Sequence, residues 1–235
     1  MNLELVTIGV IVANVLVSLK GFDDYAFRSK YMFNVGAIHR GEHLRMITSA
    51  FLHADMQHLA FNMITLFFFA NTVIFELGAT NFLLIYLGSL LLGSLFSFYF
   101  HKNEYHYSAL GASGAVSGIL FSAILLRPHM MINFIIPGYV FAVGYLLFSI
   151  YGMKKRTGNI GHDAHFGGAV AGFIITLALR KELLFEQTWI VIAMAVSDYR
   201  IVCIEQNGEN IKSTSSKKKI SRFKRFKKQK VHTYV

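Results

Sequence analysis

Three sets of polar side chains stand at the starts of three apolar stretches of this sequence. They are His58 and Asn62 opening the run 56–76, Ser113 within Gly111-Ala112-Ser113-Gly114, and His165 opening the run 162–180. Imidazole, amide and hydroxyl groups are costly inside a membrane span and usually mark a function there. A hydroxyl, an imidazole to take its proton and further donors for an oxyanion are the groups that a serine hydrolase needs.

The composition indicates a membrane protein with several spans. Of the 235 residues, 54% are hydrophobic and only 15% are charged, and the charges avoid the long apolar runs. This is too apolar for a soluble domain of the same size. The first apolar segment, 3–19, lacks a basic start and a clear cleavage site, so we expect a retained helix rather than a signal peptide. The single cysteine, Cys203, excludes an internal disulfide.

Six apolar runs are long enough, or nearly so, to cross a bilayer as helices. They lie at about 3–19, 56–76, 81–100, 111–127, 134–152 and 162–180. The sequence therefore predicts an all-α membrane protein built as a six-transmembrane-helix bundle. The long connection 20–55 still carries many apolar residues, so we expect part of it to lie against the membrane interface as an amphipathic element.

The chain divides into a six-helix core, 1–182, and a juxtamembrane segment with a basic tail, 183–235. The run 189–196 is too short to span and is expected at the membrane surface. Nine Lys and Arg lie within 217–230, which favours contact with anionic lipid; no nucleic-acid partner is expected, because no binding fold accompanies the charge. Six spans place both termini on one side, and the basic tail makes that side cytoplasmic, although the basic loop 154–156 then falls outside.

This topology brings the three polar sets to one depth of the membrane. With the N-terminus inside, the second, fourth and sixth helices all run from outside to inside. His58, Ser113 and His165 then lie near the outer surface, and Asn62 shares a helix face with His58.

Glycines beside Ser113 and His165 predict a close approach of the fourth and sixth helices. Gly114-x-x-x-Gly118 and Gly168-x-x-x-Gly172 are patterns that let helix backbones pack tightly in lipid. Ser113 and His165 can then form a catalytic dyad, in which the imidazole activates the hydroxyl. Backbone N–H groups at the helix start, together with His58 and Asn62, are the expected oxyanion donors.

Each feature has a simpler interpretation. Gly-x-Ser-Gly alone is more typical of helix packing. The pattern of soluble hydrolases, Gly-x-Ser-x-Gly, is absent, because its last position is Ala115 instead of glycine. His58, Asn62 and His165 could hydrogen-bond between helices or reach for water. No Glu stands in a His-Glu-x-x-His pattern, which argues against a metal, and no cofactor is expected. Asp163 lies on nearly the opposite helix face from His165, which favours a dyad over a triad.

The ordered set of motifs resembles the rhomboid family of intramembrane serine proteases. The resemblance covers about residues 1–182 and rests on His53-x-x-x-x-His58-x-x-x-Asn62, Gly111-Ala112-Ser113-Gly114 and Ala164-His165-Phe166-Gly167-Gly168-x-x-x-Gly172. It implies a helical fold with a water-filled cavity facing outside, and a serine endopeptidase of the cell membrane that cuts single-span membrane proteins near the outer end of their helix.

The same resemblance implies roles for individual residues. Ser113 would be the nucleophile, His165 the general base and later acid, and His58 and Asn62 oxyanion donors. The expected structural residues are Gly111, Gly114, Gly168, Gly172 and Arg45. Two positions depart from the family pattern: Leu44 precedes Arg45 where Trp is frequent, and Ser117 stands where an aromatic commonly packs on the catalytic imidazole.

Two other functions stay open at this stage. A catalytically inactive relative would bind membrane helices without cutting them, and the intact dyad argues against it. A transporter or channel is disfavoured because the sequence has neither repeats nor a charged residue in the middle of a span.

Overall fold

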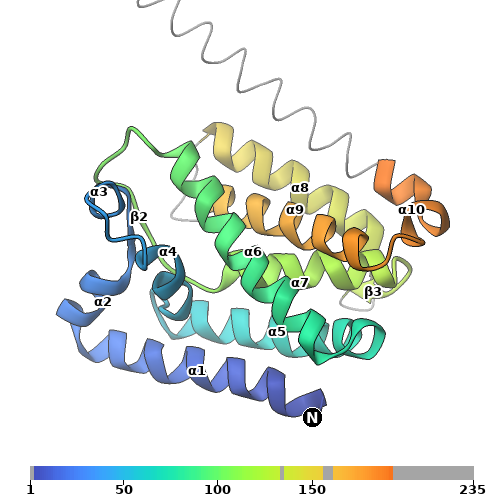
Figure 1. Cartoon of the computed structure of the whole chain (residues 1–235), viewed down its shortest axis with the longest axis horizontal. Coiled ribbons are helices and arrows are strands. Elements are labelled where there is room, and N and C mark those ends of the chain that lie inside the picture. Colours follow the sequence, from blue (N-terminus) through green and yellow to red (C-terminus); the bar gives the residue numbers. More distant parts are fainter. Residues whose placement is uncertain (1–2, 133–134, 156–160, 193–235) are drawn as a thin grey trace, which may run out of the picture. The chain divides into compact units, whose positions relative to one another are not determined.

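The computed structural model describes residues 3–132, 135–155 and 161–192, and within them the chain is an all-α membrane bundle with short connecting strands. The long helices are α1 (Leu3–Asp23), α5 (Met56–Leu77), α6 (Ala79–Phe100), α7 (Ser113–Leu126), α8 (Gly138–Lys155) and α9 (His162–Leu179) (Figure 1). Four described helices are long and apolar enough to cross a membrane: α1 from Leu5, α5, α6 and α9. At 14 residues, α7 is shorter, about 21 Å by helical rise.

The connection between α1 and α5 folds into short elements with a small core of its own. They are α2 (Tyr25–Tyr31), β1 (Phe33–Asn34), α3 (Val35–His39), α4 (Arg45–Thr48) and the 3-10 turn η1 (Ser49–Phe51). Phe33 pairs with Ala109 of β2 (Ser108–Ala109), so this connection is tied to the segment before α7. The buried cluster consists of Phe33, Val35, Ile38 and Met46. The connection is therefore a folded cap of short elements. That part of it lies against the membrane interface stays a prediction.

Further short elements follow α7 and α9. β3 (Met131–Ile132) and β4 (Ile136–Pro137) form a hairpin before α8, and α10 (Leu183–Glu186) follows α9. Pro137 directly precedes α8, and a proline keeps the residue before it in an extended conformation, so this helix begins at 138 rather than at the predicted 134. The basic tail within 217–230 and residues 193–196 of the predicted surface run lie outside the described residues.

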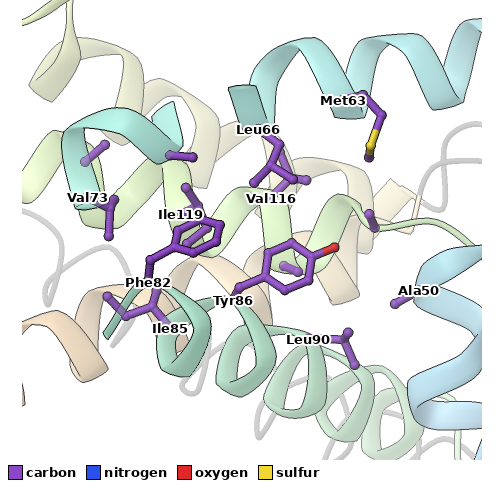
Figure 2. Close-up of a cluster of buried hydrophobic side chains, with 14 of the residues drawn as sticks. Ala50, Met63, Leu66, Val73, Phe82, Ile85, Tyr86, Leu90, Val116 and Ile119 are labelled. Carbon is purple, nitrogen blue, oxygen red and sulfur yellow. The ribbon is translucent and has the colours of Figure 1, made fainter. Parts of the chain in front are cut away.

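Helix α7 lies at the centre of the bundle. Twelve of its fourteen residues are buried, because it packs against α5, α6 and α9, while α1 covers α5 and α8 covers α9. Figure 2 shows the core between α5, α6 and α7, where Leu66, Phe82, Tyr86 and Ile119 converge. The first residue of this central helix is Ser113.

Large aromatic side chains cover the outer face of α5. Phe61, Phe68 and Phe75 are 72%, 68% and 72% exposed and recur every seven residues, so they form one stripe along the helix. Such a stripe is unfavourable in water and well suited to lipid.

Charged residues join the C-terminal ends of α5, α7 and α9. Arg127 Nε lies 2.8 Å from Glu76 Oε1, and Arg180 Nη1 lies 3.8 Å from Glu76 Oε2. Since the three C-terminal ends meet, the three helices run in the same direction and their N-terminal ends, with the polar sets, lie at the opposite end of the bundle.

Candidate active site

Ser113 is the first residue of α7 and follows a tight turn. Gly111 has φ +130°, a conformation that favours glycine, and its N–H donates to the Ser49 carbonyl at 3.0 Å. Because the first N–H groups of a helix have no partner within it, the half-buried Ser113 side chain lies beside unpaired donors and the positive end of the helix dipole.

The His58 ring reaches the same glycine from α5. Asp55 caps this helix by accepting from the His58 N–H at 2.8 Å. A Cβ atom added at Gly111 would lie 2.6 Å from His58 Cε1, 2.9 Å from His58 Nε2 and 3.7 Å from Ser113 Oγ. The imidazole of His58 and the hydroxyl of Ser113 therefore converge on one point above Gly111.

Asn62 lies one turn further along α5 and is 3% exposed. Its Nδ2 donates to the His58 carbonyl at 3.0 Å, within the same helix. A side-chain amide has two N–H groups, so one remains to serve as a donor beside His58.

The glycine faces of α7 and α9 meet directly. A Cβ atom at Gly114 would lie 3.1 Å from the Ala164 carbonyl oxygen, one at Gly168 would overlap the Gly114 carbonyl, and one at Gly172 would overlap the Gly118 carbonyl. Ser113 directly precedes Gly114, and His165 directly follows Ala164. The contact between the two backbones therefore brings the starts of α7 and α9, with both residues, close together. Within the described residues, no hydrogen bond joins the Ser113 hydroxyl and the His165 ring. Catalytic hydrogen bonds often tighten only when substrate binds.

An aromatic ring from α8 packs on His165. The rings of Tyr145 and His165 are nearly parallel, with an interplanar angle of 23° and centroids 6.3 Å apart. The Tyr145 hydroxyl lies 2.6 Å from the Ser117 hydroxyl on α7. Sequence reasoning missed Tyr145, because a tyrosine within an apolar run carries no signal of the neighbour that it contacts.

His53 links α1 to the turn that precedes Ser113. It is fully buried, with Nδ1 2.8 Å from Ser18 Oγ of α1, while the Ala112 N–H points to Nε2 at 3.4 Å. The pKa of His53 is lowered to about 3, mainly by burial and also by neighbouring His58, while Asp55 partly offsets both effects. A neutral ring that accepts at Nε2 must carry its proton on Nδ1 and donate to Ser18, whose hydroxyl donates to the Phe51 carbonyl. The sequence motif included His53 but did not indicate this role.

Asp163 is engaged away from His165. Its Oδ1 lies 3.6 Å from His101 Nε2 and accepts from the Tyr107 hydroxyl at 3.4 Å, and Tyr107 stacks on His101 with centroids 3.5 Å apart. Burial lowers the pKa of His101, but Asp163 and Glu104 outweigh it, so the pKa lies above its ordinary value. The carboxylate thus fastens the start of α9 to the segment after α6, in keeping with its predicted place off the His165 face.

Arg45 fastens the cap. Its Nη1 donates to the carbonyls of Ser29 at 2.8 Å and Met32 at 3.0 Å, and its Nε pairs with Glu42 at 2.7 Å. The guanidinium thereby satisfies carbonyls at the end of α2, which have no partner within the helix. Among the described residues, no group of three His, Cys, Asp or Glu is arranged to hold a metal ion.

Comparison with known proteins agrees with this architecture. Residues 40–182 match the family model described as the Rhomboid domain. The chain is 30% identical over 197 residues to RHOMBOID-like protein 12, mitochondrial, of Arabidopsis thaliana, covering 75% of this chain and 59% of the relative. It is 33% identical to Rhomboid protein 1, mitochondrial, of Saccharomyces cerevisiae (59% of this chain, 44% of the relative) and 33% identical to Putative rhomboid protease YdcA of Bacillus subtilis (64% and 74%).

The chain thus spans about half the length of the two mitochondrial relatives. The matched residues contain all three polar sets and the glycine faces that join α7 to α9. This chain is a multi-pass integral membrane protein of the rhomboid family.

Proposed function

We propose that this protein is an intramembrane serine endopeptidase that cleaves membrane-spanning substrates near the extracytoplasmic side with a Ser113–His165 dyad. The observation that carries the proposal is the backbone contact between Gly114 and Ala164, which brings the starts of α7 and α9 together. His58 approaches the same point over Gly111, so nucleophile, base and a donor come from three different helices.

In the proposed reaction, Ser113 Oγ attacks the carbonyl carbon of the scissile peptide bond while His165 takes the hydroxyl proton. The oxyanion that forms would be stabilised by the Ser113 N–H, the His58 ring and the free N–H of Asn62. When the C–N bond breaks, His165 returns the proton to the leaving amine. Water then attacks the acyl-enzyme, again with His165 as base, and releases the second product and the free serine.

The His53 network supports the oxyanion donors in this mechanism. The Ala112 N–H is held by His53 Nε2, so His53 supports the turn that carries the Ser113 N–H, the backbone donor proposed for the oxyanion. In this proposal His53 and Ser18 act indirectly, by holding the turn 111–113 in place.

The substrates we propose are single-span membrane proteins that reach a water-filled cavity open to the outer side, with both termini of the chain cytoplasmic. The name of the Bacillus subtilis relative, a putative protease, supports the activity. The cell membrane is the proposed location, and fractionation of cellular membranes tests it against the mitochondrial location named for two relatives. Anionic lipid is the proposed contact of the basic tail.

Labelling with a fluorophosphonate separates an active protease from an inactive relative that only binds membrane helices. The proposal expects an adduct on Ser113 in the wild-type chain, and none in Ser113→Ala or His165→Ala at equal expression. A folded wild-type chain that binds single-span segments but neither labels nor cleaves a panel of them would favour the inactive binder.

A further inference from the structure

The catalytic imidazole of the proposed dyad is held in a way that α7 alone does not supply. The residue one turn after Ser113 is Ser117, whose side chain is too short to cover the His165 ring. The aromatic partner of that ring comes instead from α8, where Tyr145 lies nearly parallel to it at 6.3 Å between centroids. Offset parallel rings at 4.5–7 Å attract each other.

We infer that Tyr145 is a positioning residue for His165 and that Ser117 holds Tyr145 in place. The inference rests on the proposed protease function, and it adds α8 to the elements that build the site. The hydroxyl groups of Ser117 and Tyr145 are 2.6 Å apart, a short hydrogen bond for two neutral groups. Ser117 is 4% exposed, so little water competes for this bond.

The surroundings of Tyr145 leave its ring few other orientations. Phe121 of α7, which is fully buried, lies 5.5 Å from the Tyr145 centroid at a 60° tilt, and Phe141 lies 5.9 Å away on the preceding turn of α8. Two rings, one hydroxyl and the imidazole thus contact Tyr145 from α7, α8 and α9.

The position of α8 matters for the site. Because the ring that orients His165 belongs to α8, the imidazole geometry depends on the packing of α8 against α7 and α9. Gly152 of α8 faces α9 and allows close packing there, because a Cβ atom at this position would overlap the His162 ring, one turn before His165. His162 itself lies 6.4 Å from His165 at an angle of 69°, edge to face, so it does not replace Tyr145 as a parallel partner.

Three substitutions test the inference by measuring kcat and KM for a single-span reporter and the rate of fluorophosphonate labelling at Ser113. Tyr145→Leu removes the ring and is expected to lower kcat and the labelling rate about tenfold with little change in KM, the loss of one aromatic contact. Tyr145→Phe keeps the ring and is expected to stay within about threefold of wild type. Tyr151→Leu is the matched control: Tyr151 lies on the same helix but is 55% exposed, so this variant should behave as wild type.

The labelling curve separates positioning from folding. A purely structural loss lowers the fraction of chains that label, whereas mispositioning lowers the rate constant at full amplitude. Tyr145→Leu labelling at the wild-type rate, or losing amplitude alone, would overturn the role of Tyr145 while leaving the protease function intact. A wild-type chain that neither cleaves nor labels would instead overturn the protease function, and the positioning role with it.

Discussion

Replacing Gly168 by alanine is expected to push α7 and α9 apart at the point where they carry Ser113 and His165. The added methyl would overlap the Gly114 carbonyl and lie 2.9 Å from Gly114 Cα. Non-bonded carbons pack at ~3.5–4.0 Å, so the helices must separate by roughly 1 Å. Both obstacles are backbone atoms, so no change of side-chain rotamer relieves the overlap.

The effect on activity should exceed the effect on stability. Overpacking costs about 1–3 kcal/mol, and replacing a helical glycine by alanine returns about 1 kcal/mol, which leaves a net loss of roughly 0–2 kcal/mol. A misplacement of about 1 Å between reacting groups can lower the rate by about 100-fold. Gly168→Ala should therefore remain largely folded and lose most of its turnover.

Initial rates of reporter cleavage in proteoliposomes and thermal unfolding in detergent would measure the two effects. Gly144→Ala is the matched control, because a Cβ atom at this glycine of α8 meets nothing within 4 Å. The control should cleave normally and gain about 0.5–1 kcal/mol of stability. Wild-type turnover and an unchanged melting temperature for Gly168→Ala would refute the close contact of α7 with α9.

Three further changes probe the support of the site. Gly111→Ala meets both the left-handed φ and the His58 ring, so we expect a loss of cleavage and about 1–3 kcal/mol of stability, measured by labelling and unfolding; normal labelling would contradict it. His53→Phe keeps an aromatic ring at the buried position but leaves the Ala112 N–H unpaired, which should cost about 1–3 kcal/mol; an unchanged melting temperature would argue against the network. The raised pKa of His101 means that its stabilising contribution is present below pH about 6.5 and is lost as the pH rises through its folded pKa; His101→Gln should therefore destabilise more at pH 5.5 than at pH 8.5, and equal losses would contradict the pairing.

The long helices could be predicted from the sequence because their signal is local. A run of apolar residues specifies a span wherever it lies, and the predicted run 162–180 differs from α9 by one residue at its end. The alignment of α5, α7 and α9 also followed from the sequence, since alternating spans must run in alternating directions. The contact of Glu76 with Arg127 and Arg180 was not needed for that prediction and agrees with it.

What the sequence could not supply are contacts that depend on helix rotation and on pairing between distant segments. Tyr145 reaches His165 only because α8 turns one particular face toward α9, and its apolar run favours no single face. His53 meets Ser18 across 35 residues, and Phe33 pairs with Ala109 across 76. Neither contact leaves a periodic pattern, which is why the sequence did not indicate how the connection 20–55 folds.

Cleavage of a single-span reporter by purified wild-type, Ser113→Ala and His165→Ala chains in liposomes probes the dyad itself. We expect one cut near the outer end of the reporter helix for the wild-type chain, and no cut above background for either variant at equal folding. Cleavage that persists in Ser113→Ala, at the same bond and at a comparable rate, would contradict it.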